Sequence, residues 1–190
     1  MALNASGPIS LIGSITGQSI AKELSLSETS QLSLFDSSVR TLLGVASGPI
    51  SMFNGYGKSS SFVFNQTISS DTTNYNLKSA AIAAGWDQTV PLVATITINS
   101  SIYVYSTSTG SYAFDTGSSF YSGSTLALIN NGTILGKGGD GGTGGLNASA
   151  GAAGGSGGPA FIGRYAINVT NNGTIGGGGG GGGGGSGDYG

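Results

Sequence analysis

Apolar and polar residues alternate with a period of two in several short stretches, which is the pattern of half-buried β-strands. The clearest stretch is 90–99, in which every second residue from Val90 to Ile98 is apolar. Residues 102–106 follow after a two-serine break and predict a hairpin with this strand, and 125–129 predicts a further strand. The chain is therefore expected to be mainly β.

Three other stretches complete the expected elements. Residues 19–27 carry short apolar alternations such as Leu24-Ser25-Leu26 and predict a half-buried strand. Residues 33–43 begin with a sequence similar to a capping box and are followed by Gly44, so they predict a short helix. The alanine-rich stretch 76–84, which ends at Gly85, predicts a second one.

Two short sequences recur in the chain, each 41 residues after its first copy. Ser-Gly-Pro-Ile-Ser occupies 6–10 and 47–51, and Asn-Asn-Gly-Thr-Ile occupies 130–134 and 171–175. The second pair follows strand-like stretches and precedes glycine tracts, so it predicts a stacked or duplicated layer. We divide the chain into an N-terminal domain at 1–60, a β-rich middle domain at 61–129 and a glycine-rich domain at 130–190.

Glycine keeps a period of three in the last domain, beginning with Gly138-Gly139-Asp140, and ten consecutive glycines occupy 176–185. The polyproline II conformation has three residues per turn and no internal hydrogen bonds. Bare glycine faces would let neighbouring chains exchange N–H to C=O bonds, so we expect a polyglycine-II-like sandwich. A flexible glycine linker is the simpler alternative, but the phase of the glycines and the interleaved apolar residues favour the ordered form.

Composition excludes several classes of chemistry. Charged residues make up 7% of the chain, against roughly 25% in an average soluble domain, and the net charge is -2. The six basic residues stand singly, so nucleic acid is not an expected partner. With neither cysteine nor histidine, the chain holds no disulfide, no thiolate or imidazole metal site and no Ser-His-Asp triad. Its first twenty residues lack the features of a secretory signal, and membrane insertion is not expected.

Several stretches resemble tail proteins of tailed bacteriophages. They are 6–10 with 44–48 and 56–59, then 83–87 with 90–98, and finally the Asn-Asn-Gly-Thr-Ile and polyglycine modules. The modules are similar to glycine-rich tail fibre and receptor-binding adhesin proteins, including the distal adhesins of T-even phages. In those adhesins, polyglycine II helices form a sandwich, and variable segments between the glycine motifs bind the host receptor.

The resemblance implies receptor-binding segments at 146–153, 160–165 and 188–189. The candidate receptor-binding residues are Leu146, Asn147, Phe161, Arg164, Tyr165, Asp188 and Tyr189. No catalytic residue, cofactor or metal ligand is expected. The implied partners are other tail or baseplate proteins at the N-terminal region and a host surface protein or glycan. The protein is expected to be a virion tail component, assembled in the host cytoplasm as a homo-oligomer, with a trimer favoured.

Aromatic and acidic residues offer other candidate sites, each with a simpler structural explanation. An aromatic concentration in the middle domain offers a face for a carbohydrate or a protein, although packing is the stronger expectation; its members are Tyr103, Tyr105, Tyr112, Phe114, Phe120 and Tyr121. Four aspartates stand without the spacing of a calcium loop; they are Asp71, Asp87, Asp115 and Asp140. No carboxylate pair is singled out as that of a glycosidase.

Three functions remain open at this point. The first is a host-binding tail adhesin, the second is an architectural tail subunit that seals an oligomer, and the third is an ice- or surface-binding protein. Regular threonines on one face would favour the third, and only Thr143 lies within the glycine triplets. The chain is therefore expected to act by binding and assembly, without catalysis.

Overall fold

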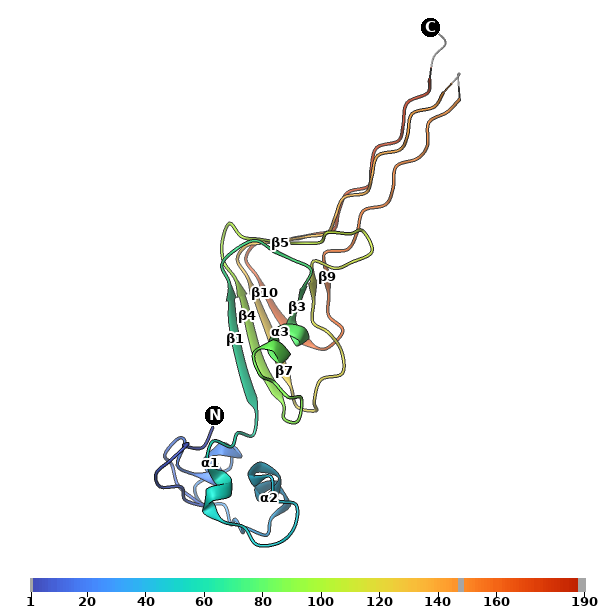
Figure 1. Ribbon diagram of the computed structural model, residues 1–190. Helices are drawn as coiled ribbons and strands as arrows, with labels where there is room; N and C mark the ends of the chain where they lie inside the picture. The colour runs from blue at the N-terminus through green and yellow to red at the C-terminus, as the bar shows by residue number, and fades with distance from the viewer. Residues whose placement is uncertain (1, 147–148, 188–190) are drawn as a thin grey trace. The chain divides into compact units, whose positions relative to one another are not determined.

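The computed structural model describes residues 2–146 and 149–187. The chain divides into two compact units, Met1–Val63 and Phe64–Gly190. The first holds three short helices, and the second is built from β-strands and glycine-rich segments (Figure 1). No helix of the described residues is long and apolar enough to cross a membrane.

The first unit folds around a small apolar core. Its helices are α1 (Ile20–Glu23), α2 (Ser37–Leu43) and the 3₁₀ helix η1 (Met52–Gly55). The core residues come from the chain start and from α1 and α2: Leu3, Ile20, Val39, Leu42 and Leu43. The two Ser-Gly-Pro-Ile-Ser copies act alike, because Gly7 and Gly48 both have positive φ and both following isoleucines pack on this core.

Helix α2 confirms the helix predicted at 33–43, but it begins four residues later, at Ser37. The backbone N–H of Ser33 donates to the Asp36 carboxylate at 2.7 Å, so these residues form a turn that precedes the helix. Gly44 ends the helix with φ of 69°, the left-handed conformation that glycine adopts without a Cβ clash.

The strand predicted at 19–27 is wrong, because the chain forms α1 there. The Ser19 hydroxyl accepts a hydrogen bond from the Lys22 backbone and caps the helix, while Ile20 and Ala21 are buried. Ser25 then takes a positive φ of 58°, which breaks the extended path on which the Leu24-Ser25-Leu26 alternation depended. A run this short fits the period of a helix and of a strand equally well, and the burial of Ile20 and Ala21 favours the helix.

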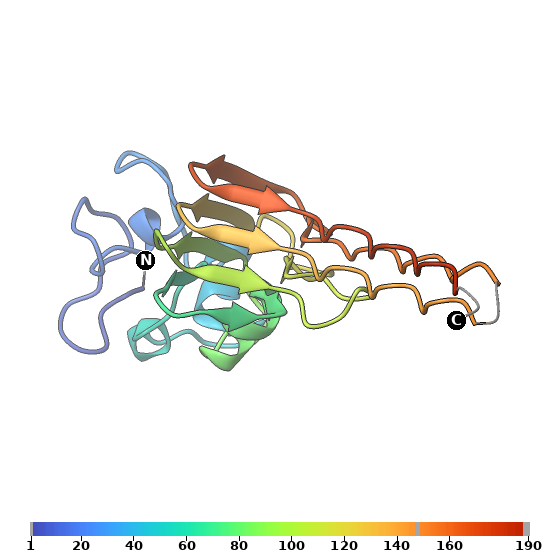
Figure 2. The same cartoon turned by 90° about the horizontal axis from the view of Figure 1, so that it is seen from above.

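The second unit winds its strands into a coil with three parallel sheets (Figures 1 and 2). The first sheet has the order β1 (Phe62–Ile68), β4 (Leu92–Ile98), β7 (Thr125–Asn130) and β10 (Ile167–Asn171). The second has β2 (Thr72–Thr73), β5 (Tyr103–Tyr105), β8 (Thr133–Leu135) and β11 (Thr174–Gly176). The third has β3 (Tyr75–Asn76), β6 (Phe114–Asp115) and β9 (Phe161–Ile162).

Each of the first three passes of the chain contributes one strand to each sheet, and the last pass contributes β10 and β11 to the first two, so neighbouring strands in a sheet come from different passes. The predicted strands at 90–99, 102–106 and 125–129 are confirmed as β4, β5 and β7. The hairpin is wrong, because β4 pairs with β7 and β5 pairs with β2 and β8, all in parallel. Ser101, with φ of 65°, turns the chain into the next sheet.

The interior of the coil is filled by ladders of equivalent side chains. Leu92, Ala94, Ile96 and Ile98 of β4 are all buried, which confirms the alternation read from the sequence. In the third sheet, three aligned rings stack: Tyr75 and Phe114 at 5.2 Å between centroids, and Phe114 and Phe161 at 5.6 Å. Full burial of one such apolar side chain contributes about 1.5 to 3 kcal/mol.

Helix α3 (Leu77–Ala83) confirms the helix predicted at 76–84. The Asn76 side chain caps its first turn by accepting from the Ser79 backbone at 2.9 Å. Leu77 and Ala81 face the core, and Trp86 beyond the helix is also buried, with its ring N–H donating to the Val90 carbonyl.

The 41-residue spacing of the two Asn-Asn-Gly-Thr-Ile copies is the length of the last turn of the coil. Strand β10 pairs with β7 and β11 pairs with β8 at a register of 41 residues. At the corner where β7 and β10 end, the Asn130 side-chain amide donates to the Asn171 side-chain oxygen at 2.7 Å. A Cβ at Gly173 would overlap the backbone of Gly132 in the turn below. The repeated Asn-Asn-Gly therefore reflects stacked corners, and the predicted duplicated layer is confirmed.

Candidate functional site

Three glycine-rich segments extend from one end of the coil and lie side by side (Figures 1 and 2). The first, 136–145, continues strand β8; the second, 149–158, returns to β9; and the third, 176–187, continues β11. The first and third run in the same direction, and the second runs opposite, as the pairing below shows. We call these three segments the glycine bundle.

Backbone hydrogen bonds close the glycine bundle into a ring of three segments. The first segment donates to the third at every third residue, from Gly136 N–H to Gly176 C=O at 2.9 Å up to Gly145 and Gly185. The third donates to the second, as from Gly181 to Gly155 at 2.8 Å, and the second donates to the first, as from Gly155 to Asp140 at 2.7 Å. The period of three in the sequence is therefore the period of these bonds.

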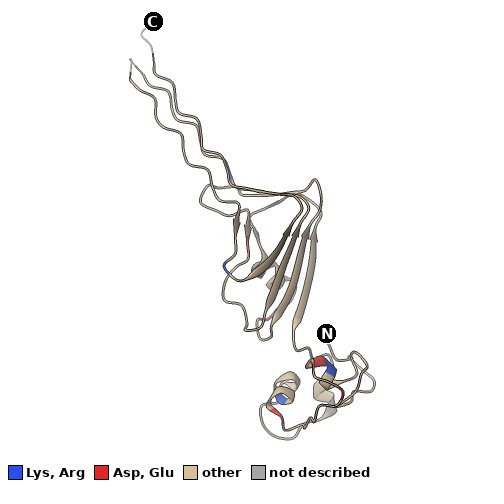
Figure 3. Ribbon diagram, turned by 180° about the vertical axis from the view of Figure 1, so that it is seen from behind, with Lys and Arg blue, Asp and Glu red and all other residues tan. Residues whose placement is uncertain are grey.

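One residue in three of each segment lies too close to a neighbouring backbone for any side chain. A Cβ at these positions would overlap a carbonyl oxygen of the next segment, as at Gly139, Gly154 and Gly181. Other positions bear side chains without difficulty, and Lys137 and Asp140 form a surface ion pair at 4.0 Å. Figure 3 shows that charged side chains are otherwise sparse over the bundle.

The base of the glycine bundle rests on the connection between β5 and β6. A Cβ at Gly158 would approach the backbone of Thr109 in that connection to 2.6 Å. The connection is itself tethered, because the Thr107 backbone donates to the Asn74 side chain at 3.1 Å and the Asn74 amide donates to the Thr107 hydroxyl at 2.7 Å. The coil thus holds the bundle at a fixed point.

The predicted receptor-binding residues fall in two places. Leu146 stands at the far end of the glycine bundle and is 78% exposed, and its backbone carbonyl accepts from the Ser149 N–H at 3.0 Å. Phe161, Arg164 and Tyr165 lie on the coil, 15 to 19 residues after Leu146 in the sequence. Asn147, Asp188 and Tyr189 lie outside the described residues, and the receptor-binding role of the set stays a prediction.

The three candidates on the coil are held by packing and polar contacts. Phe161 stacks on Phe114 in the third sheet. Arg164 Nε donates to both carboxylate oxygens of Asp115, at 3.1 and 2.9 Å. The Tyr165 ring packs on Phe120 at 4.8 Å between centroids, and its hydroxyl donates to the Ser124 backbone carbonyl at 3.3 Å.

The aromatic concentration of the middle region is divided between core and surface. Phe114 is fully buried, and Phe120 stacks on Trp86. Tyr103, Tyr105 and Tyr121 are between 42% and 47% exposed. Tyr112 lies under the Arg164 guanidinium, whose carbon is 5.4 Å from the ring centroid.

The isolated aspartates serve local hydrogen bonds. Asp71 accepts from the Tyr103 backbone at 2.9 Å, and Asp115 accepts from the Gly117 backbone at 2.8 Å. Hydrogen bonds from the Thr89 backbone and hydroxyl hold the pKa of Asp87 below its usual value. Within 2–146 and 149–187, no three acidic side chains gather into a metal site.

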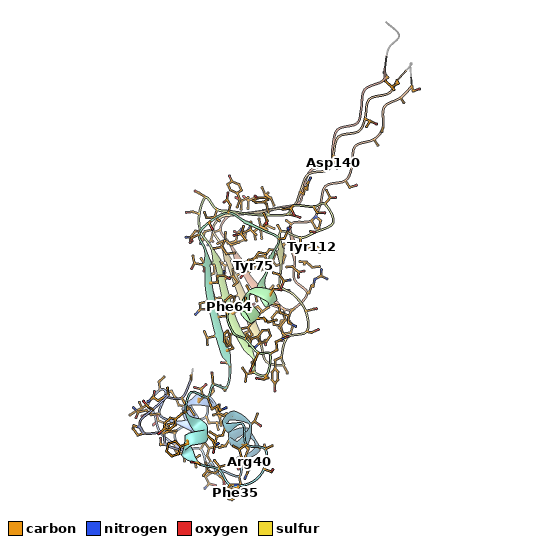
Figure 4. The ribbon with its side chains drawn as sticks, in the orientation of Figure 1. Phe35, Arg40, Phe64, Tyr75, Tyr112 and Asp140 are labelled. Carbon is orange, nitrogen blue, oxygen red and sulfur yellow. The ribbon has the colours of Figure 1, made fainter. Side chains whose placement is uncertain are left out.

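A cavity of about 280 Å³ on the coil brings together polar residues that the sequence had not connected. Its lining includes Asn74, Asn76, Ser111, Tyr112, Asp115 and Arg164. Figure 4 labels Tyr112 of this lining and also Tyr75, which precedes Asn76 in β3. Asp115 and Arg164 are 49 residues apart, so only the stacking of β6 on β9 joins them.

Comparison with protein families places the second unit. The family described as phage tail fibre adhesin Gp38 matches residues 63–190. Neither the comparison with curated proteins nor that with solved structures gave a match. The match covers more than half of the chain, including the parallel coil and the glycine bundle, and it confirms the resemblance to tail fibre adhesins. The chain therefore belongs to the phage tail fibre adhesin Gp38 family and is a virion tail component.

Proposed function

We propose that this protein binds a host surface receptor through the far end of its glycine bundle, and that the first unit attaches it to the tail. The family of the chain is one of adhesins, and the proposal adds which surface of this protein contacts the receptor. The observation that carries it is the 78% exposure of Leu146, an apolar side chain presented at the end of a hydrogen-bonded support. An exposed apolar side chain on a rigid support is suited to contact with a partner.

The glycine bundle is proposed to be a small polyglycine-II-like assembly. Support comes from its hydrogen bonds at every third residue and from the absence of any φ between +20° and +160° among its described glycines. Three residues per turn is the period of the polyproline II conformation. Such an assembly gives Leu146 a stiff support, because the backbone of each segment is hydrogen-bonded to both others.

Binding to intact host cells tests the receptor proposal. Full-length protein is mixed with candidate host cells, and the bound fraction is measured by sedimentation. Leu146→Asp places a charge at the far end of the bundle, and Ser156→Asp places the same charge on an exposed position nearer the coil. We expect the first variant to lose binding and the second to keep it. Equal binding by both variants would place the contact elsewhere, and a folded protein without any binding would favour the architectural role.

The first unit lies outside the family match except for its last residue, so its attachment role rests on its own surface. Phe35 and Phe53 are 81% and 80% exposed, which is unusual for phenylalanine. Arg40 lies 5.5 Å from the Phe35 ring centroid, and Tyr56 contacts the Phe53 ring edge-on. We expect Phe35→Ser and Phe53→Ser to reduce capture of purified tail fibre protein, while Leu146→Asp leaves that capture unchanged.

A further inference from the structure

The cavity beside Arg164 has the features of a small-molecule site, which neither the family nor the proposed role of Leu146 accounts for. Its volume of about 280 Å³ lies just below the lower limit of about 300 Å³ for ligand pockets. One ring of a ligand fits such a space. Asn76 and Asp115 of its lining lie on strands β3 and β6, and the other lining residues lie in the connections beside these strands.

The polar groups of the cavity are held in place by bonds that leave other atoms free. Asn76 uses its carbonyl oxygen to cap α3, so its amide Nδ2 remains available. Arg164 binds Asp115 through Nε, and its backbone N–H donates to the Thr116 hydroxyl at 2.8 Å. In the described part of the chain, no hydrogen bond engages the terminal nitrogens of Arg164, the Ser111 hydroxyl or the Tyr112 hydroxyl.

The charges of the cavity favour a neutral ligand. Asp115 and Arg164 neutralise each other at 2.9 Å, so an anion would meet the carboxylate and a cation would meet the guanidinium. The ligand must instead bring groups that both donate and accept. Hydroxyl groups do this, because one can donate to Asp115 while its neighbour accepts from Arg164. The Tyr112 ring, one face of which lies against the Arg164 guanidinium, adds an aromatic wall for an apolar face.

We propose that this cavity binds one neutral sugar ring of a surface glycan, as a second site in addition to the contact proposed at Leu146. Adjacent hydroxyls of a pyranose match the paired carboxylate and guanidinium, and its C–H face matches the tyrosine ring. The site is independent of the proposed role of Leu146, since it lies on the coil at the opposite end of the glycine bundle.

Saturation-transfer NMR on the full-length protein tests this site. The probes are methyl glycosides of glucose, galactose and N-acetylglucosamine, with glucuronate as the acidic comparison. We expect a neutral glycoside to bind with a dissociation constant in the millimolar range. Asp115→Asn and Tyr112→Ala should weaken that binding at least about tenfold.

A third variant fills the cavity without removing any of its polar groups. A Cβ at Gly110 meets only ordinary contact, with the Ser108 hydroxyl at 3.8 Å, so Gly110→Leu should fold and block the site. It keeps the test decisive if Asp115→Asn loses its fold. Leu146→Asp should bind sugar as the unchanged protein does, which separates this site from the receptor proposal. Absence of binding to the neutral glycosides, preference for glucuronate, or equal binding by Gly110→Leu would overturn the assignment.

Discussion

Alanine substitutions at two adjacent glycines test the packing of the glycine bundle. A Cβ at Gly181 would overlap the carbonyl oxygen of Asp140, whereas a Cβ at Gly182 meets nothing within 4 Å. Neither glycine has a positive φ, so alanine suits the backbone at both positions. Gly181→Ala must therefore push the third segment away from the first, while Gly182→Ala adds a methyl group in open space.

The magnitude follows from the hydrogen bonds beside the overlap. The displacement weakens about three backbone hydrogen bonds. Gly139 to Gly179 at 2.8 Å and Gly142 to Gly182 at 2.7 Å join the first and third segments, and Gly155 to Asp140 at 2.7 Å uses the overlapped carbonyl oxygen as its acceptor. At a net value of about 1 kcal/mol each, the loss is about 3 kcal/mol. Alanine restores about 0.4 to 1 kcal/mol by restricting the unfolded chain. The expected result is a destabilisation of about 2 kcal/mol for Gly181→Ala and a slight stabilisation for Gly182→Ala.

Amide hydrogen exchange followed by NMR measures this difference locally. The Gly139 and Gly155 amides should exchange about thirtyfold faster in Gly181→Ala, because about 1.4 kcal/mol corresponds to a factor of ten. The same amides should be unchanged or slower in Gly182→Ala. Equal exchange rates in the two variants would refute the claim that close backbone approach requires glycine at every third position.

Three further predictions concern stability. Burial raises the pKa of Tyr75, whose hydroxyl donates to Gln66 at 2.6 Å. The folded state then keeps the proton more tightly than the unfolded chain, so stability is full below about pH 10 and falls above it; urea midpoints at pH 8 and 11 should differ less in Tyr75→Phe. Asn130→Ala removes the hydrogen bond that the fully buried Asn130 side chain donates to Asn171 and should cost about 2 to 4 kcal/mol, measured by urea unfolding with tryptophan fluorescence. Gly44→Ala, at φ of 69°, should lower the stability of the first unit by about 1 to 2 kcal/mol, seen in the helical circular dichroism signal on heating.

Local patterns in the sequence predicted the elements whose own residues contain the cause. The alternation from Val90 to Ile98 predicted β4 because one face of that strand is buried along its full length. The alanine run before Gly85 predicted α3, whose Asn76 cap is also local. The strand predicted at 19–27 was wrong, because a four-residue helix and a four-residue strand have nearly the same apolar pattern. Packing against the core that includes Leu3 and Val39 favoured the helix.

The candidate site divides in the same way. The period of three predicted bonded glycine segments, and the 41-residue repeat predicted the stacked corners. No sequence pattern predicted the pairing of Asp115 with Arg164, because the two residues are 49 positions apart and share no motif. The tether from Asn74 to Thr107 had none either, since it joins separate turns of the coil.

The residues alone establish a chain with little charge, no imidazole or thiol chemistry and a glycine-rich part with a fixed period, and their alternation predicts that it is mainly β. Tertiary structure alone decided that β4 and β5 lie in different sheets, that the sheets are parallel, and that Leu146 stands apart from Arg164. The physical reason is that periodicity reports which face of a segment is buried, whereas the choice of partner depends on contacts between residues tens of positions apart.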